Sequence, residues 1–249
     1  MIYKILIKFI IFLRNLLPLK IISNHRYLNK NQVTNLEICM FLLKQRGFYP
    51  SNILDIGCFE GLWTKKIMKI FQHSRYFLFD ANKENEKFLN NIVKQFPNVS
   101  YKIKLLSNEE KKYKFYKMKS GSSIFEEKTD FPRTSEFIDS SLLSNEINEN
   151  IISTTNNLIK IDAQGSEINI LKGLKDFIDH FEVIILEVSL HNYNKNAPLF
   201  DEVMTFMTSK KFVLYDIYDL KRSGENKSFL FQYDCIFVRN NSKLLNVKF

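Results

Sequence analysis

A loop with two glycines follows the first apolar run of the chain, and it constrains the fold more than any other stretch. Residues 53–61 read ILDIGCFEG, and the residues from Leu62 to Ile67 then place apolar side chains at helical spacing. A buried strand, a tight loop and a helix in this order are typical of an open parallel sheet with helices on both faces. Gly57 can take a positive φ and leave backbone open to a ligand, and Gly61 lets the helix begin close to the strand.

Acidic residues at the ends of two successive strands indicate the kind of ligand. The loop reads G-x-x-x-G and lacks the third glycine of the dinucleotide pattern. Asp55 would repel a pyrophosphate, whereas the ammonium, sulfonium and ribose hydroxyls of S-adenosylmethionine suit a carboxylate. A second apolar run ends at Asp80, about 20 residues further on, where an acid can hold ribose hydroxyls. The alternative is that Asp55 caps a helix and Asp80 simply ends a strand.

Length and composition predict one domain with appendages. The 249 residues suffice for one sizeable core. We expect an N-terminal helical segment over 1–49, an α/β domain over 50–240 and a tail over 241–249. Residues 119–157 are polar and irregular, and we interpret them as a variable insertion that forms a lid or binds the acceptor.

Alternating patterns along the domain predict its remaining elements. A leading helix is expected over 31–46, with Val33, Leu36, Met40 and Leu43 on one stripe. Further strands are predicted over 99–106, 113–118, 157–162, 181–188, 212–217 and 232–238, and further helices over 83–96, after Gly165 and over 198–210.

The chain is basic, and its first residues are both apolar and cationic. The formal net charge of +9 favours anionic partners, although lysines scattered along the whole sequence explain it equally well. Residues 1–22 carry Lys4, Lys8, Arg14 and Lys20, which interrupt the apolar run too often for a membrane span. This segment is expected either to lie in a membrane interface or to pack on the domain. The three cysteines lie far apart, so we expect a cytoplasmic protein, either free or peripheral to the inner face of the membrane.

Four acids are expected at one edge of the sheet. Asp55, Asp80, Asp162 and Glu187 each lie at or near the end of a predicted strand. Because the carboxyl ends of parallel strands meet at one edge, these side chains should converge there. Ser107 follows the strand predicted over 99–106, where a side chain can meet an adenine amino group.

Several blocks of the sequence together resemble the FkbM family of S-adenosylmethionine-dependent methyltransferases. They are DIGCFEG at 55–61, FDAN at 79–82, KIDAQGSE at 160–167 with LKG at 171–173, ILEV at 185–188 and DCIFV at 234–238. The resemblance implies a doubly wound, mostly parallel seven-stranded sheet with an antiparallel last strand. It also implies methyl transfer to a hydroxyl, commonly of a sugar or polyketide-type product. The chain departs from the family pattern at Cys58-Phe59, where Ala-Asn is usual, and at Asp80-Ala81, where Glu-Pro is usual.

The strand ends and the resemblance together predict the site residues. Asp162 is the first candidate for a general base, and Glu187 and His191 are the next. No metal site is predicted. The residues expected to bind S-adenosylmethionine are Asp55, Gly57, Cys58, Glu60, Gly61, Asp80, Ala81, Asn82 and Ser107.

The function hypothesis is an O-methyltransferase that acts on a hydroxyl of a sugar, a glycan or a similar small molecule. The acceptor is expected to be a small-molecule or lipid-linked glycan and not nucleic acid, because the four acids at the edge of the sheet would repel a polyanion. One alternative is a nicotinamide-dependent oxidoreductase, against which the missing third glycine argues. The other alternative is a non-catalytic basic module that binds membrane or nucleic acid. This alternative would leave the four acids at the edge of the sheet unexplained.

Overall fold

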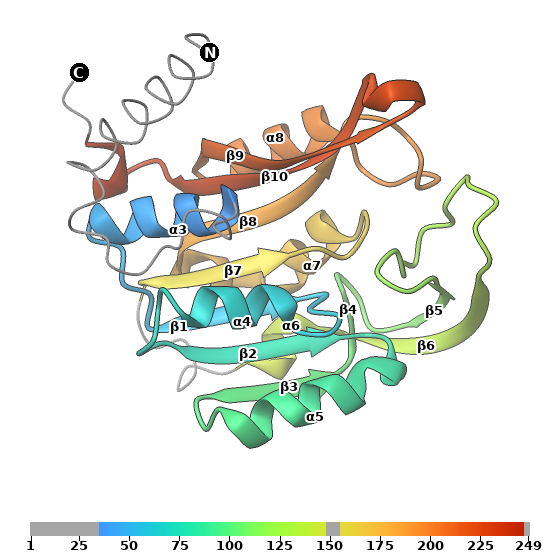
Figure 1. Cartoon of the computed structure of the whole chain (residues 1–249), viewed down its shortest axis with the longest axis horizontal. Coiled ribbons are helices and arrows are strands. Elements are labelled where there is room, and N and C mark those ends of the chain that lie inside the picture. The colour runs from blue at the N-terminus through green and yellow to red at the C-terminus, as the bar shows by residue number, and fades with distance from the viewer. Residues whose placement is uncertain (1–34, 148–154, 247–249) are drawn as a thin grey trace, which may run out of the picture. The chain divides into compact units, whose positions relative to one another are not determined.

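A central sheet with helices on both faces forms the body of the structure (Figure 1). The computed structural model describes residues 35–147 and 155–246, and within these ranges the sheet has seven strands. In the order in which they lie across the sheet, they are β3 (Val99–Ile103), β2 (Arg75–Asp80), β1 (Asn52–Ile56), β7 (Asn157–Ile161), β8 (Phe181–Ser189), β10 (Phe229–Arg239) and β9 (Phe212–Ser223). β10 runs antiparallel to β8 and β9, and the pairs among β3, β2, β1, β7 and β8 are parallel.

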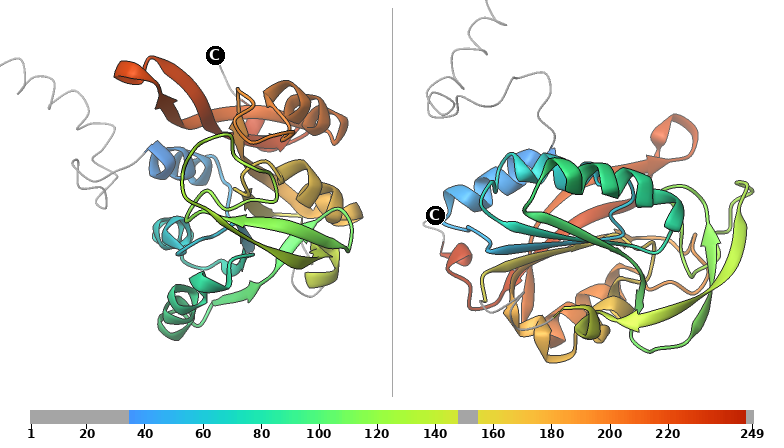
Figure 2. Two further views of the ribbon diagram at one scale, coloured as in Figure 1. Left: turned by 90° about the vertical axis from the view of Figure 1, so that its right-hand side faces the viewer. Right: turned by 90° about the horizontal axis from the view of Figure 1, so that it is seen from below.

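The helices divide between the two faces of the sheet (Figure 2). One face carries α3 (Asn35–Gln45), α4 (Leu62–Met68) and α5 (Glu86–Gln95); the other carries α6 (Leu143–Glu146), α7 (Glu167–Gly173) and α8 (Phe200–Ser209). Alternation along the central strands supplies both cores: Ile53 and Leu158 pack toward α3–α5, and Leu54 and Ile159 pack toward α7 and α8. This arrangement confirms the predicted fold class.

A smaller sheet lies at the carboxyl ends of the parallel strands (Figures 1 and 2). It consists of β4 (Leu105–Ser107), β6 (Thr134–Leu142) and β5 (Lys112–Lys117), in that order. The single strand predicted over 99–106 is wrong, because β3 ends at Ile103 and the next residues leave the main sheet to pair with β6.

Residues 119–157, expected to be irregular, also contain regular structure. β6 and α6 lie inside this range. The strand escaped notice because most side chains of its first half, TSEFI, face solvent and are polar, so no apolar alternation marks it. Residues 148–154, which lie near the end of the predicted insertion and before β7, fall outside the described residues.

The leading helix has the buried stripe that its sequence predicts. α3 buries Leu36, Met40 and Leu43 and is followed by Gly47 at φ 92°. Residues 31–34 of the predicted helix, with Val33, lie outside the described residues. The segment over 1–22, which is expected to lie in a membrane interface or to pack on the domain, also lies outside them. No helix in the part of the chain that the structure describes is long and apolar enough to cross a membrane.

Candidate active site

Two glycines set the shape of the loop after β1. Gly57 and Gly61 both have φ of 70°. A Cβ on Gly57 would lie 1.9 Å from the backbone oxygen of Asp162, and a Cβ on Gly61 would lie 2.3 Å from Cδ1 of Ile92. Gly57 therefore lets the ends of β1 and β7 touch, and Gly61 lets α4 begin directly against α5. The sequence predicts the positive φ of Gly57 but not these two contacts.

A cavity, here called the rim hollow, opens where β1, β2 and β7 end. Its volume is about 60 Å³. The predicted residues Gly57, Asp80, Ala81 and Asp162 line it. The lining also includes apolar side chains from several elements: Ile56, Phe79, Leu105, Leu106, Phe115 and Ile170.

Asp80 holds the loop after β1 and still faces the rim hollow. One carboxylate oxygen accepts the backbone N–H of Phe59 at 2.7 Å, and the other accepts the backbone N–H of Asn82 at 2.8 Å and Nδ2 of Asn85 at 3.0 Å. Burial raises the pKa of Asp80, although these hydrogen bonds act in the opposite direction. Because a carboxylate has about four acceptor positions, Asp80 can accept a further hydrogen bond from a ligand.

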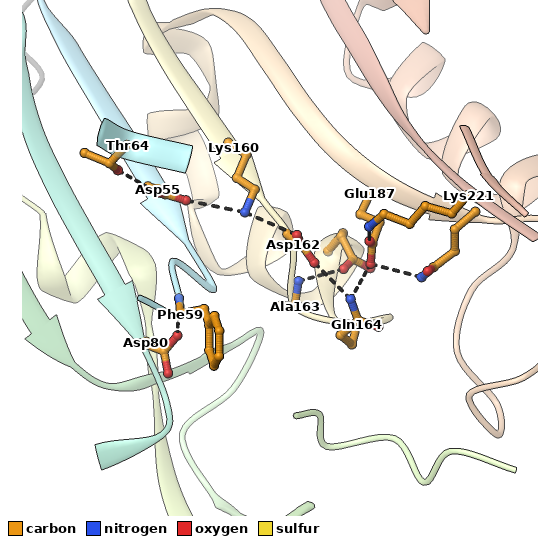
Figure 3. Close-up of polar contacts among 12 residues, drawn as sticks. Asp55, Phe59, Thr64, Asp80, Lys160, Asp162, Ala163, Gln164, Glu187 and Lys221 are labelled. Atoms are coloured by element: carbon orange, nitrogen blue, oxygen red, sulfur yellow. Dashed lines mark hydrogen bonds and ion pairs between the residues drawn. The ribbon is translucent and has the colours of Figure 1, made fainter. Parts of the chain in front are cut away.

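Asp55 lies away from the rim hollow, so its predicted contact with the ligand is wrong. The side chain is fully buried under α4, where it accepts a hydrogen bond from Oγ1 of Thr64 at 2.6 Å and faces Nζ of Lys160 at 3.5 Å (Figure 3). Side chains alternate along a strand, and Asp55 points to the face of the sheet that carries α3, α4 and α5 instead of past the sheet's edge. Its role is to join β1, α4 and β7. Burial raises its pKa, with Lys160 acting against that rise.

Lys160 is a buried cation between two carboxylates. It is the register partner of Asp55 on the neighbouring strand, and its Nζ also lies 3.3 Å from Asp162. Sequence reasoning gave this residue no role. A signal for it exists in the sequence, because Lys160 lies inside the apolar run NLIKI. A lysine buried in such a strand requires a partner of opposite charge, and the neighbouring strand carries an acid.

Asp162 is the carboxylate that combines charge with access. Its side chain is 28% exposed, it lines the rim hollow, and it accepts a hydrogen bond from Nε2 of Gln164 at 3.0 Å. Burial acts to raise its pKa, but the cations of Lys160 and Lys221 outweigh burial and lower it. The carboxylate is therefore ionised at neutral pH.

Gln164 connects Asp162 to Glu187, and it too was missed from sequence. Its Nε2 donates to both carboxylates, its Oε1 accepts the hydroxyl of Tyr193 at 2.7 Å, and its backbone oxygen accepts Oγ of Ser123 at 2.8 Å. The residue has φ of 51°. A non-glycine residue in this conformation is strained, and such strain is concentrated at functional sites.

Glu187 is buried and fully engaged. It accepts hydrogen bonds from Lys221, Gln164 and Gln232, the last at 3.0 Å. Burial and the nearby charge of Asp162 raise its pKa well above the usual value. Because these donors occupy its oxygens, it is placed to orient Gln164 and Lys221 and not to take a proton from a substrate.

A second cavity, here called the outer cavity, adjoins the rim hollow. Its volume is about 1050 Å³. Residues 117–134 line one side, and β8, β9, β10, Gln164 and the residues after β8 line the other. Glu187 and His191 lie on this cavity and not on the rim hollow. His191 is exposed and stacks on Phe229 with 4.2 Å between ring centroids. Lys119 and Ser120 line both cavities and so separate them.

Five further candidates do not line the rim hollow: Cys58, Glu60, Gly61, Asn82 and Ser107. Cys58 is buried in the core under α3–α5, and Glu60 lies outside the lining. The side chain of Asn82 caps the 3-10 turn Lys83–Asn85 by accepting the N–H of Glu84.

Ser107 is displaced because β4 has left the main sheet. It is fully buried, and its hydroxyl donates to Tyr113 at 3.0 Å. The residues that reach the rim hollow from this part of the chain are Lys104, Leu105 and Leu106, and Ser107 itself does not line it. No cluster of three or more His, Cys, Asp or Glu side chains that could hold a metal occurs within residues 35–147 and 155–246.

Comparison with models of protein families identifies the family of the chain. The model of the methyltransferase FkbM domain matches residues 55–214, which is more than half of the chain. The chain belongs to the FkbM methyltransferase family. The enzyme is thus a methyltransferase whose cofactor is S-adenosylmethionine, as the sequence predicts.

Three solved structures show similarity to the chain at low sequence identity. Precorrin-6y C5,15-methyltransferase from Geobacter metallireducens GS-15 has a TM-score of 0.47 at 10% identity, covering 86% of this chain and 92% of that one. TrmK from M. capricolum, in complex with S-adenosyl-homocysteine, has a TM-score of 0.45 at 12% identity, covering 80% and 67%. The bifunctional kinase-methyltransferase WbdD has a TM-score of 0.49 at 13% identity, covering 86% and 40%. No curated protein matches the chain.

The rim hollow of this FkbM methyltransferase has the chemistry that S-adenosylmethionine requires. The free acceptor position of Asp80 suits a ribose hydroxyl, Gly57 contributes to the lining without a side chain, and Leu105 and Leu106 would offer apolar surface to adenine. The volume of about 60 Å³ is far below the roughly 300 Å³ of a small ligand pocket. The rim hollow must therefore widen before it can hold the whole cofactor.

Proposed function

We propose that this enzyme transfers the methyl group of S-adenosylmethionine to a hydroxyl oxygen of a sugar, a glycan or a similar small molecule. The observation that carries the proposal is the position of Asp162. Its ionised carboxylate lines the rim hollow, and its partner Gln164 lines the outer cavity. An acceptor in the outer cavity can therefore present a hydroxyl to Asp162 at the boundary with the cofactor site.

The outer cavity suits an acceptor that carries several hydroxyls. Gln164, Gln232, Tyr193 and Lys221 line it and supply donors and acceptors. Phe229 and the stacked His191 offer flat apolar surface on which a sugar ring can pack. Few oriented polar groups on an apolar wall are typical of small-molecule sites.

The chain contributes proton removal and positioning. S-adenosylmethionine supplies an electrophilic methyl group when bound. A hydroxyl that receives it loses its proton, and Asp162, held ionised by Lys160 and Lys221, is placed to accept that proton. Gln164 fixes the carboxylate through the hydrogen bond to Oδ1.

An acceptor of modest size, free or linked to lipid, fits this cavity better than a nucleic acid. The proposal also keeps peripheral membrane contact through residues 1–22 as one way to reach a lipid-linked glycan. Flotation with liposomes of the full chain, compared with a chain that begins at Asn24, tests that contact. Equal flotation of the two would remove it.

The transfer itself is tested with Asp162→Asn. The full chain is incubated with methyl-labelled S-adenosylmethionine and a panel of sugar acceptors, and the product is examined by NMR for a methyl ether. Loss of a general base lowers turnover by about 10²–10⁴. Binding of S-adenosyl-homocysteine, measured separately by calorimetry, should persist in the variant.

Asp176→Asn is the matched control, since it removes an exposed carboxylate from the 3-10 turn Lys175–His180, which precedes β8 at the opposite edge of the sheet. It should keep full turnover. Full turnover in Asp162→Asn, or a methyl group found on nitrogen or carbon instead of oxygen, would contradict the proposal. Thermal stabilisation by NAD and not by S-adenosyl-homocysteine would favour the oxidoreductase alternative.

A further inference from the structure

Several cations line the outer cavity, and not all of them take part in the proposed methyl transfer. Its lining includes Lys117, Lys119, Arg133 and Lys221. Lys117 is paired with Glu84 at 3.1 Å and Glu136 at 3.5 Å, and Lys221 is paired with Glu187. The charges of these two lysines are therefore already balanced by the protein.

Lys119 is a cation with no ion-pair partner in the described part of the chain. Its side chain is exposed, and it lines both the outer cavity and the rim hollow. Its backbone has φ of 46°, which is unfavourable for a residue other than glycine. The tight turn that follows fixes this conformation, with N–H of Gly121 donating to the backbone oxygen of Met118 at 2.8 Å and Ser122 Oγ donating to that of Lys119 at 2.8 Å.

Arg133 is held in place by backbone oxygens, and so its charge is not neutralised. Its Nε, Nη1 and Nη2 donate to the backbone oxygens of Phe131, Glu127 and Thr129, respectively. Among residues 35–147 and 155–246 it forms no ion pair with a carboxylate. One N–H on each of Nη1 and Nη2 is left over, and a guanidinium with two such donors can bind a carboxylate or a phosphate.

Two acids lie on the same lining, Glu127 and Glu187, and Glu187 is already paired with Lys221. Glu127 accepts a hydrogen bond from the hydroxyl of Thr129, and its Oε2 lies against Gly121. It is part of the same loop and has no ion-pair partner among the described residues. With Lys117 and Lys221 already paired, the lining retains two unpaired cations against this single unpaired carboxylate.

We propose that the acceptor carries an anionic group, a carboxylate or a phosphate, that Lys119 and Arg133 bind while the reacting hydroxyl lies at Asp162. The proposal deepens the proposed function and rests on it for the position of the hydroxyl, but binding of the anion can be measured without any methyl transfer. Lys119 belongs to the partition between the cavities, so it can contact an acceptor close to the cofactor.

The test measures binding to the full chain saturated with S-adenosyl-homocysteine. The probes are three related sugars: a methyl hexoside, the methyl hexuronoside of the same sugar, and the hexose phosphate. Affinity is followed by NMR saturation transfer and calorimetry. The hexuronoside or the phosphate should bind at least about tenfold more tightly than the neutral hexoside, because hydrogen bonds to charged groups are the stronger ones. Which of the two anions binds identifies the source of the charge.

Lys119→Gln should remove most of this preference while leaving S-adenosyl-homocysteine bound. Arg133→Gln should do the same, but Arg133 also ties the loop together, so Lys119→Gln is the variant that decides. Lys94→Gln, on the exposed surface of α5, is the matched control and should bind all probes as the unchanged chain does. About 1 M sodium chloride should also weaken the preference, since it shortens the Debye length to about 3 Å.

Equal binding of neutral and anionic probes overturns the proposal. It is also overturned if neither anion binds, or if Lys119→Gln keeps the same preference for the anionic probe. Methylation of neutral hydroxyl acceptors at full rate, with no gain from an added anion, would refute this inference and leave the O-methyltransferase function intact. Methyl transfer to oxygen that fails for every acceptor, while an anion still binds at Lys119, would refute the function and leave the anion site.

Discussion

Replacing Lys160 by Met tests whether the buried charge group holds the fold together. Lys160 lies between Asp55 at 3.5 Å and Asp162 at 3.3 Å, with its side chain 7% exposed. Met fills most of the same space without the charge. Asp162 is 28% exposed and can turn to water, but Asp55 is fully buried and would retain only the hydroxyl of Thr64. The variant therefore strands one carboxylate in the core.

Removing one partner from a buried ion pair costs about 3–5 kcal/mol of the free energy of unfolding. For a chain of this size about 1 kcal/mol corresponds to roughly 2–4 °C in Tm, so the expected loss is about 6–20 °C at neutral pH. An exposed pair would cost no more than about 1 kcal/mol. The magnitude thus separates a buried pair from a surface one.

The loss should depend on pH with a definite sign. Burial raises the pKa of Asp55 above its unfolded value of about 3.9, and removing Lys160 raises it further. A carboxyl group with a raised pKa favours the folded state when protonated, so this contribution is full below the unfolded pKa and is lost as pH rises through the folded one. The gap in Tm between the variant and the unchanged chain should therefore widen from acidic pH toward pH 8.

Calorimetric melting curves over this pH range measure the gap. The double variant Lys160→Met/Asp55→Asn should recover much of the lost stability, because the amide is neutral and its oxygen can still accept the Thr64 hydroxyl. Lys94→Met, on exposed α5, controls for the loss of a lysine. A loss below about 1 kcal/mol, a gap that narrows toward high pH, or no recovery in the double variant would refute the reasoning.

Three further predictions concern the cofactor site. Gly57→Ala should lower Tm well beyond Gly47→Ala, because both positions have positive φ but only Gly57 would place a Cβ 1.9 Å from a backbone oxygen; equal shifts in melting experiments would contradict this. Asp80→Asn should weaken binding of S-adenosyl-homocysteine by about tenfold or more in calorimetry. In the unchanged chain this affinity should fall as pH drops through the raised pKa of Asp80, and a flat profile would argue against a ribose contact. Ser107→Ala should leave the affinity unchanged, and a clear loss would restore the original adenine-facing prediction.

Local patterns predicted the main sheet and the loop after β1 because each depends on neighbouring residues. The run ILDI, the glycines at 57 and 61 and the helical stripe after them are all visible within about one element's length. The strand over 157–162 and the acid that closes it were predicted for the same reason, and they are β7 and Asp162.

The contacts that connect strands were beyond such patterns. Whether Asp55 points over the edge of the sheet or under α4 depends on the register of β1 with β7, which pairs it with Lys160. Gln164, Lys221 and Gln232 meet at Glu187 from separate parts of the chain, and only the folded sheet shows that they do. β6 was missed because its polar face carries no periodic signal.

The strand order has a consequence for synthesis on the ribosome. β10 lies between β8 and β9, yet it follows both of them along the chain. Until Phe229–Arg239 has emerged, β8 and β9 have no common partner, and a nascent chain presents the open edge of β8 with its unpaired backbone groups. Insertion of this late strand between two earlier ones completes the sheet, so the methyltransferase can close its core only after translation has passed Arg239.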